Sequence, residues 1–242
     1  MEPDPGVRSQ FHHELASVNA DLSQLIASVG EEVAQATECL LTDGKEASID
    51  FMSRRHWTDP LYEHVAEEVE VLMARQAPVA SDLRYLLAVV RAVPELEQSA
   101  ALADEIARRG GLGIAAELTP RARALVTRMG DIVTAMWQEL DRGWQQRSVI
   151  ADNLEAARSE LHDLHTTLTA EVASAEMAAS VTMDMALVGR FYERLGDHSV
   201  NIASRLHTLR TWPAATSAAD AAARHPAGSA RGPDYPPDPV LS

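Results

Sequence analysis

Residues 25–40 read LIASVGEEVAQATECL, and residues 125–140 read LVTRMGDIVTAMWQEL. The two segments align without a gap, and four of their residues are identical at an offset of 100: Leu25, Gly30, Val33 and Leu40 fall on Leu125, Gly130, Val133 and Leu140. A second pair of segments matches later in each half, where Glu97 falls on Glu193 at an offset of 96. Two matches in the same order predict a duplicated structural unit.

Apolar residues recur at spacings of three and four through most of the chain, as in Leu15, Val18, Leu22, Leu25 and Val29. This spacing is typical of helices that bury one face. It predicts helices over residues 8–42, 46–76, 79–109, 121–142, 147–173 and 176–211. Pro60 follows Thr58 and Asp59, which predicts a cap or a kink in the second of these helices.

Long helices with short connections pack as antiparallel bundles. Together with the repeat, they predict an all-α fold of two tandem antiparallel three-helix bundles, at residues 8–110 and 118–211. Residues 212–242 are rich in Ala, Pro, Ser and Gly and carry few large aliphatic side chains. Such a segment cannot bury enough apolar surface to offset the entropy of ordering, so we expect a disordered C-terminal tail.

The charge and composition of the chain exclude several functional classes. Its 242 residues carry 36 Asp and Glu against 21 Lys and Arg, a formal net charge of −15. A net acidic chain without a basic cluster is poorly suited to nucleic acid, whose binding depends on neutralising phosphates. No apolar run reaches the ~18 residues of a membrane-spanning helix. The first ten residues lack the apolar core of a signal peptide, and the single Cys39 fits a reducing compartment, so we expect a cytoplasmic protein.

The common motifs of nucleotide-binding and metal enzymes are absent. The residues around Lys45 lack the first glycine and the hydroxyl of a phosphate loop, and no CxxC, HExxH or GxSxG occurs. His162 and His165 lie three residues apart on an expected helix and could place two imidazoles on one metal ion. Because no third ligand is evident nearby, we interpret them instead as polar neighbours of Leu161 and Leu164.

The most informative segment is GRFYERLGDHSVNIASRL, residues 189–206. At about 100° per residue, one helix face opposite the apolar stripe carries Arg190, Glu193, Asp197 and Asn201, and we expect this face to point outward. Glu193 and Asp197 lie one turn apart, so their carboxylates can converge on a hard cation such as magnesium, manganese or iron. The alternative is a solvated face with Arg–Glu pairs, each of which contributes little.

This segment and RQAPVASDLRYLLAVV, residues 75–90, resemble two signatures of the PhoU family of phosphate-signalling proteins. The family motif is close to E-R-x-G-D-x-A-x-N-I-A, and residues 193–203 match it almost throughout. The P-V-A-x-D-L-R signature is met at residues 78–84. The FYER and LHDLH variants are most similar to the actinobacterial branch of the family, and the resemblance covers roughly residues 8–211.

The resemblance implies a cytoplasmic, non-enzymatic regulator. In the family, such a protein links the ATPase subunit of the high-affinity phosphate transporter to a sensor histidine kinase, and it represses the phosphate-starvation response when phosphate is ample. We further expect a homodimer, with a monomer as the alternative, and only indirect membrane association; the acidic charge balance argues against a nucleic-acid partner. The resemblance assigns signature or partner-binding roles to Asp82, Arg84, Arg190, Arg194 and His198.

Members of the family also bind metal ions on the outer helix face through E/D-x-x-x-D pairs. The resemblance carries this role to Glu193 and Asp197, with Asn201 as a further ligand, for Mg, Mn, Fe or Zn. In the first half Glu97 stands at the glutamate, but Ala101 replaces the aspartate and offers no ligand atom. We therefore expect the site that includes Glu97 to be weak or lost.

The alternative function is a metal-dependent helical-bundle enzyme, such as a carboxylate-bridged oxidase or a phosphohydrolase. Such enzymes need carboxylates that face the bundle interior and usually use Glu-x-x-His ligand pairs. The chain has no Glu-x-x-His pair, and Glu193 and Asp197 are expected outside. The sequence therefore favours a regulator that works by binding.

Overall fold

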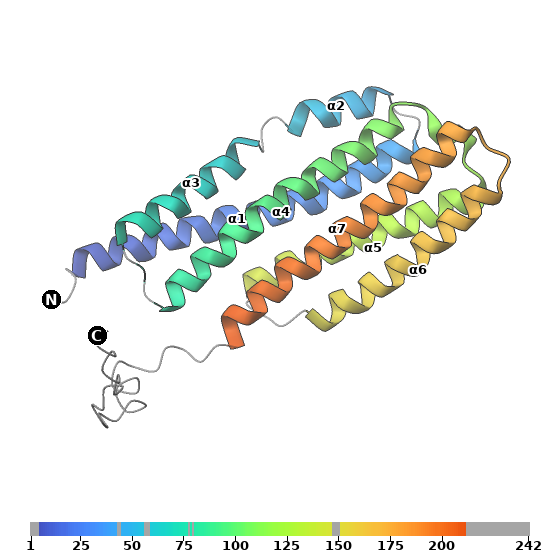
Figure 1. The fold of residues 1–242 in the computed structure, drawn as a ribbon. Helices are drawn as coiled ribbons and strands as arrows, with labels where there is room; N and C mark the ends of the chain where they lie inside the picture. Colours follow the sequence, from blue (N-terminus) through green and yellow to red (C-terminus); the bar gives the residue numbers. More distant parts are fainter. Residues whose placement is uncertain are drawn as a thin grey trace, which may run out of the picture. The chain divides into compact units, whose positions relative to one another are not determined.

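The computed structural model of the chain describes residues 5–42, 45–55, 59–76, 78, 80–146 and 151–211. The expected disordered tail at residues 212–242 lies outside these ranges. Within them the chain forms α-helices, one short 3₁₀ helix and no strand, which confirms the all-α prediction (Figure 1). The elements are α1 (Pro5–Leu41), α2 (Lys45–Arg55), α3 (Asp59–Gln76), α4 (Ala80–Gly110), η1 (Ile114–Glu117), α5 (Pro120–Gln146), α6 (Ala151–Ser174) and α7 (Ala179–Thr211).

The second expected helix, residues 46–76, was predicted wrongly as one continuous element. α2 ends at Arg55, and α3 begins at Asp59 with Pro60 in its first turn. A proline lacks the backbone N–H and clashes with the preceding turn, so it is tolerated at the start of a helix but not in its interior. The helix boundary therefore falls where Pro60 predicts a cap or kink.

Four long helices form the centre of the described fold. α1 packs against α4 and α5, and α7 packs against the same two helices, so each half contributes its first and third helix (Figure 1). α3 lies on α1 and α4, and α6 lies on α5 and α7. The expected tandem three-helix bundles are thus present, and their numerical boundaries at 8–110 and 118–211 stay a prediction.

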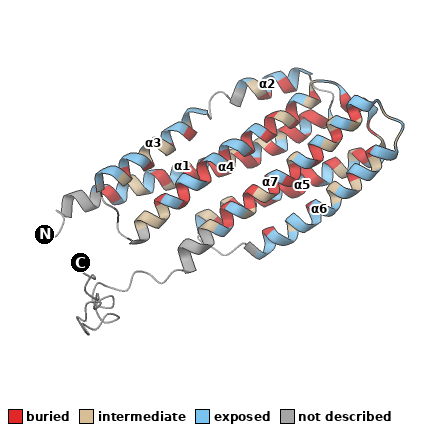
Figure 2. Ribbon diagram, viewed as in Figure 1, coloured by how far each residue is buried: buried red, intermediate tan, exposed pale blue. Residues whose placement is uncertain are grey.

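Aliphatic stripes on the central helices make the core. Figure 2 shows buried residues along the facing sides of α1, α4, α5 and α7, whereas α6 is exposed over much of its length. Trp137 and Tyr192 are the bulkiest side chains that are fully buried. None of the described helices combines the length and apolarity of a membrane span.

α1 and α5 approach each other through two glycines at equivalent positions of the repeat. A Cβ atom on Gly30 would lie 3.3 Å from the Cβ of Trp137, and one on Gly130 would lie 2.5 Å from Cγ2 of Thr37. Thr37 and Trp137 are themselves equivalent at the offset of 100. The glycine of each helix therefore packs against the equivalent residue of the other helix, as expected for two copies of one unit related by a local two-fold axis.

Thr37 packs directly against Gly130, and two hydrogen bonds hold its side chain in this position. Its Oγ1 donates a hydrogen bond to the carbonyl of Val33 at 2.8 Å. The same oxygen lies 2.8 Å from the hydroxyl of Tyr192, a buried hydrogen bond that joins α1 to α7. Burial raises the pKa of Tyr192, so the hydroxyl keeps its proton and remains available for this bond.

We expect Gly130→Ala to lower the free energy of unfolding by about 1–3 kcal/mol, the usual cost of overpacking. The added methyl group would collide with Thr37, which cannot retreat without losing its two hydrogen bonds. Gly30→Ala is the matched control, because the same change at the equivalent position meets only a 3.3 Å contact and gains helix propensity. Urea unfolding followed by circular dichroism measures both, and equal losses would contradict this reading of the interface.

Candidate functional site

The signature segment of α7 lies against α6, and two glycines permit the close approach. A Cβ atom on Gly189 would lie 2.7 Å from Cδ2 of His165, and one on Gly196 would lie 2.8 Å from Cδ2 of Leu161. Both glycines are helical, so their role here is to leave room for the side chains of α6. Glu193, which lies between the two glycines, is consequently brought against α6.

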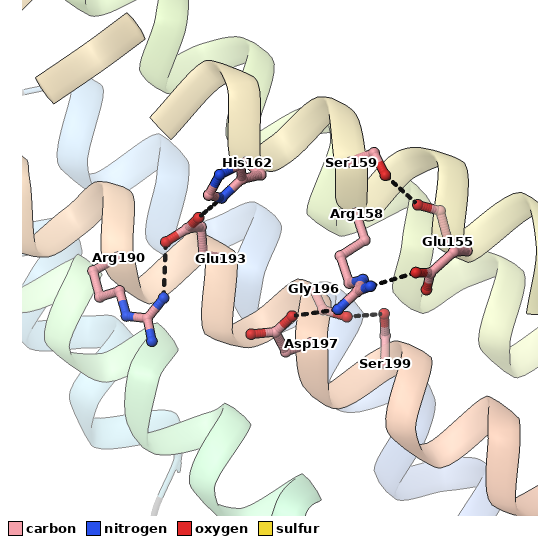
Figure 3. Close-up of polar contacts among 9 residues, drawn as sticks. All are labelled: Glu155, Arg158, Ser159, His162, Arg190, Glu193, Gly196, Asp197 and Ser199. Carbon is pink, nitrogen blue, oxygen red and sulfur yellow. Dashed lines mark hydrogen bonds and ion pairs between the residues drawn. The ribbon is translucent and has the colours of Figure 1, made fainter. Parts of the chain in front are cut away.

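Glu193 is the clearest example, because it is only 8% exposed. Its Oε1 lies 2.8 Å from Nδ1 of His162, and its Oε2 lies 2.7 Å from Nδ1 of His165. Nη1 of Arg190 donates a further hydrogen bond to Oε2 at 2.9 Å (Figure 3). The expectation that Glu193 points outward is therefore wrong: α6 covers that side of α7.

The polar partners of Glu193 offset the cost of burying its charge. Burial opposes ionisation, but the hydrogen bonds from Arg190 and His162 and the charge of His165 together hold the pKa of Glu193 below its ordinary value. The carboxylate is thus stabilised as an anion inside the seam between the two helices.

Asp197, one turn further along α7, has its own cationic partner. Nη1 of Arg158 lies 3.6 Å from its Oδ1, and the same guanidinium also pairs with Glu155 on α6 (Figure 3). Asn201, the third expected metal ligand, is exposed on α7. The structure therefore gives Glu193 and Asp197 separate partners on α6.

An open groove runs along this seam. Its volume is about 1040 Å³, and its lining includes Arg158, His162, His165, Arg190, Glu193 and Asp197. Its lining carries cationic, anionic and uncharged side chains, so it is not a purely basic anion site.

The other signature residues are divided between the interior and the surface. His198 is buried at the contact of α7 with α4, where its Nδ1 lies 2.8 Å from Oγ of Ser99, and burial lowers its pKa. Asp82 and Arg84 are half-buried on α4, and each takes part in a polar interaction within the chain. Arg190 and Arg194 are exposed on α7, and Glu97 is exposed on α4.

Sequence reasoning missed the contribution of α6. The expectation that no third ligand-type group lies near His162 and His165 is wrong, because both face Glu193. One signal was available: Arg158 and His162 lie four residues apart, as do Glu193 and Asp197, and the two pairs carry opposite charge. Complementary pairs with equal spacing on two helices predict an antiparallel contact.

The donor set does not fit a divalent cation as it stands. Each carboxylate already faces a guanidinium, from Arg190 or Arg158, and both oxygens of Glu193 have a donor within 2.9 Å. A cation at Glu193 and Asp197 would have to displace these groups, so we derive no metal chemistry at this site.

We expect Glu193→Gln to destabilise the fold by roughly 1–3 kcal/mol, because hydrogen bonds to a charged acceptor contribute more than neutral ones. The pKa of Glu193 is lowered in the folded state, so its contribution is present above the ordinary value of about 4.5 and is lost as the pH falls through the lower folded value.

Urea unfolding at neutral pH and at a pH well below the ordinary pKa of a glutamate tests this expectation. Glu97→Gln is the matched control, because Glu97 is equivalent in the repeat but exposed. A difference between wild type and Glu193→Gln that persists unchanged in acid would contradict the ion-pair account.

Comparison with known proteins identifies the family. The model of the PhoU domain matches two segments of the chain, residues 22–110 and 126–206. PhoU homolog 1 of Mycobacterium leprae, named a phosphate-specific transport system accessory protein, is 26% identical over 208 residues, which cover 83% of this chain and 92% of the relative. A PhoU homolog 2 with the same description from Mycobacterium bovis is 28% identical over 210 residues, covering 83% and 96%.

Solved structures show the same fold. The crystal structure of PhoU from Pseudomonas aeruginosa superposes with a TM-score of 0.77 at 24% identity, covering 82% of this chain and 98% of that one. PhoU from Streptococcus pneumoniae superposes with a TM-score of 0.71 at 19% identity. The two matched segments, the tandem helical bundles and the signature on α7 agree, and the chain belongs to the PhoU family.

Proposed function

We propose that this chain is a cytoplasmic regulator of phosphate homeostasis that represses the phosphate-starvation response. The observation that carries the proposal is the match of two PhoU-domain segments within one chain. The names of its relatives, phosphate-specific transport system accessory proteins, support the connection to phosphate uptake.

The proposed mechanism is binding: the chain links the ATPase subunit of a phosphate transporter to a sensor histidine kinase. Arg190 and Arg194 project from one exposed side of α7 and are our candidates for partner contacts. His198 is unsuited to this role because it is buried against Ser99. Assembly as a homodimer and indirect attachment to the membrane through the transporter remain predictions.

Catalysis is not part of the proposal. Glu193 lines the groove, and both of its oxygens accept hydrogen bonds or face an imidazole. A general base needs an oxygen within reach of the proton that it removes, and this carboxylate is committed to the helix seam.

Deletion of the gene tests the proposed function. We expect a reporter of phosphate-starvation genes to become active in phosphate-rich medium, and re-expression of the chain to restore repression. Continued repression in the deletion strain would refute the proposal.

Arg194→Ala tests the proposed surface. We expect this change to weaken co-precipitation of the transporter ATPase and to raise reporter activity, because it removes an exposed charge without touching the core. Arg128→Ala, an exposed arginine on α5 that pairs with Glu160, is the matched control. Equal effects of the two substitutions would exclude a specific role for this part of α7.

Metal binding by Glu193, Asp197 and Asn201 stays a prediction. A cation could bind there only after Arg158 leaves Asp197 and Arg190 leaves Glu193. Calorimetric titration of manganese into wild type and Asp197→Asn decides the question. Heat that disappears in the variant would support the site, and identical heats would refute it.

A further inference from the structure

A second cluster of titratable side chains lies on the opposite half of the chain, between α1 and α3. Asp21 belongs to α1, and His64 and Glu68 lie one turn apart on α3. One ligand atom from each residue can be chosen so that all three lie within 4.8 Å of one another. The cluster combines one imidazole with two carboxylates and is independent of the function proposed above.

The side chain of Glu68 is 22% exposed, and one of its two carboxylate oxygens lacks a partner. Its Oε2 is buried and has no hydrogen-bond partner within the described chain. The nearest ion-pair partner of this oxygen is Nε2 of His64 at 3.9 Å, which is too long for a hydrogen bond. Burying a polar atom without a partner is costly. Glu68 thus differs from Glu193, both of whose oxygens are satisfied.

The charges around Glu68 do not favour its ionised form. Burial raises the pKa of Glu68, and the nearby charges of Asp21 and Glu14 raise it further against the opposing effect of His64. Carboxylates that converge in this way repel one another unless a cation lies between them.

The repeat provides an internal comparison for this site. At the offset of 100, Asp21 corresponds to Arg121, which lies 3.4 Å from Glu171 on α6. In the second half, a carboxylate on the middle helix therefore has a cationic partner on the first helix. In the first half the equivalent position holds an acidic residue, Asp21, in place of the arginine.

We propose that Asp21, His64 and Glu68 bind one divalent transition-metal ion, of the zinc type, that bridges α1 and α3. An imidazole ligand favours such ions over magnesium and calcium, which prefer oxygen alone. Three protein ligands leave a fourth position for water, and His64 is exposed, so the ion reaches the site from solvent. The ion takes the place of the guanidinium that Arg121 supplies in the second half.

Zinc titration into the full chain, first stripped with a chelator, tests the proposal. We expect wild type to bind one zinc ion per chain and to gain thermal stability, because the ion binds the folded state. His64→Gln and Glu68→Gln are expected to weaken zinc binding by more than about tenfold, since each removes a ligand. Glu67→Gln, an exposed neutralisation on the same helix, is the control and should bind zinc like wild type.

Asp21→Arg provides a second, opposite readout. It places a guanidinium on α1 beside Glu68, so the metal-free variant should melt at a higher temperature than metal-free wild type and should not respond to zinc. This outcome separates loss of the site from loss of the fold.

Three results would overturn the proposal. The first is zinc binding that survives all of the Asp21, His64 and Glu68 substitutions. The second is an equal loss in Glu67→Gln, which would indicate non-specific attraction to an acidic helix. The third is a loss confined to His162→Gln, which would place the ion in the seam of α6 and α7 instead.

Discussion

The close approach of α1 and α5 at Gly30 and Gly130 is the constraint on which the rest of the fold depends. Helices that carry side chains at a contact are held apart by those side chains, whereas here each helix places Thr37 or Trp137 against the glycine of the other. The narrow spacing lets α7 reach across so that Tyr192 bonds Thr37.

Glycines also permit a close helix contact where α6 meets α7. Gly189 and Gly196 admit side chains of α6, and Glu193, which lies between them, is buried. The family signature on α7 therefore has a packing explanation: its glycine accepts Leu161, its glutamate pairs with Arg190 and the histidines of α6, and His198 bonds Ser99 of the other half. A change in any of these residues would disturb a helix contact as well as an exposed surface.

The sequence was sufficient for the helices and the duplication but not for the pairing of side chains. Periodicity reports which face of one helix is apolar, so the core stripes and the break near Pro60 could be predicted. A helical wheel says nothing of the neighbour that covers the remaining faces. Glu193 lies opposite the apolar stripe of α7 and is nevertheless buried, because α6 contributes His162 and His165 across a separation of about thirty residues. That contact depends on tertiary structure and on two small residues whose spacing carries no hydrophobic signal.

Duplication makes each half a control for the other, and the comparison shows where the two have diverged. The acidic group at Glu193 is enclosed and neutralised, whereas its equivalent Glu97 is exposed and faces no aspartate one turn later, because Ala101 stands there. The reverse holds between the first and the middle helix of each half. There Arg121 pairs with Glu171, whereas Oε2 of Glu68, beside Asp21, has no hydrogen-bond partner within the described chain. A carboxylate oxygen that is buried without a partner lowers stability unless a cation supplies the missing interaction. The difference in charge between the two halves, and not the net acidic charge of the chain, therefore supports a cation site between α1 and α3.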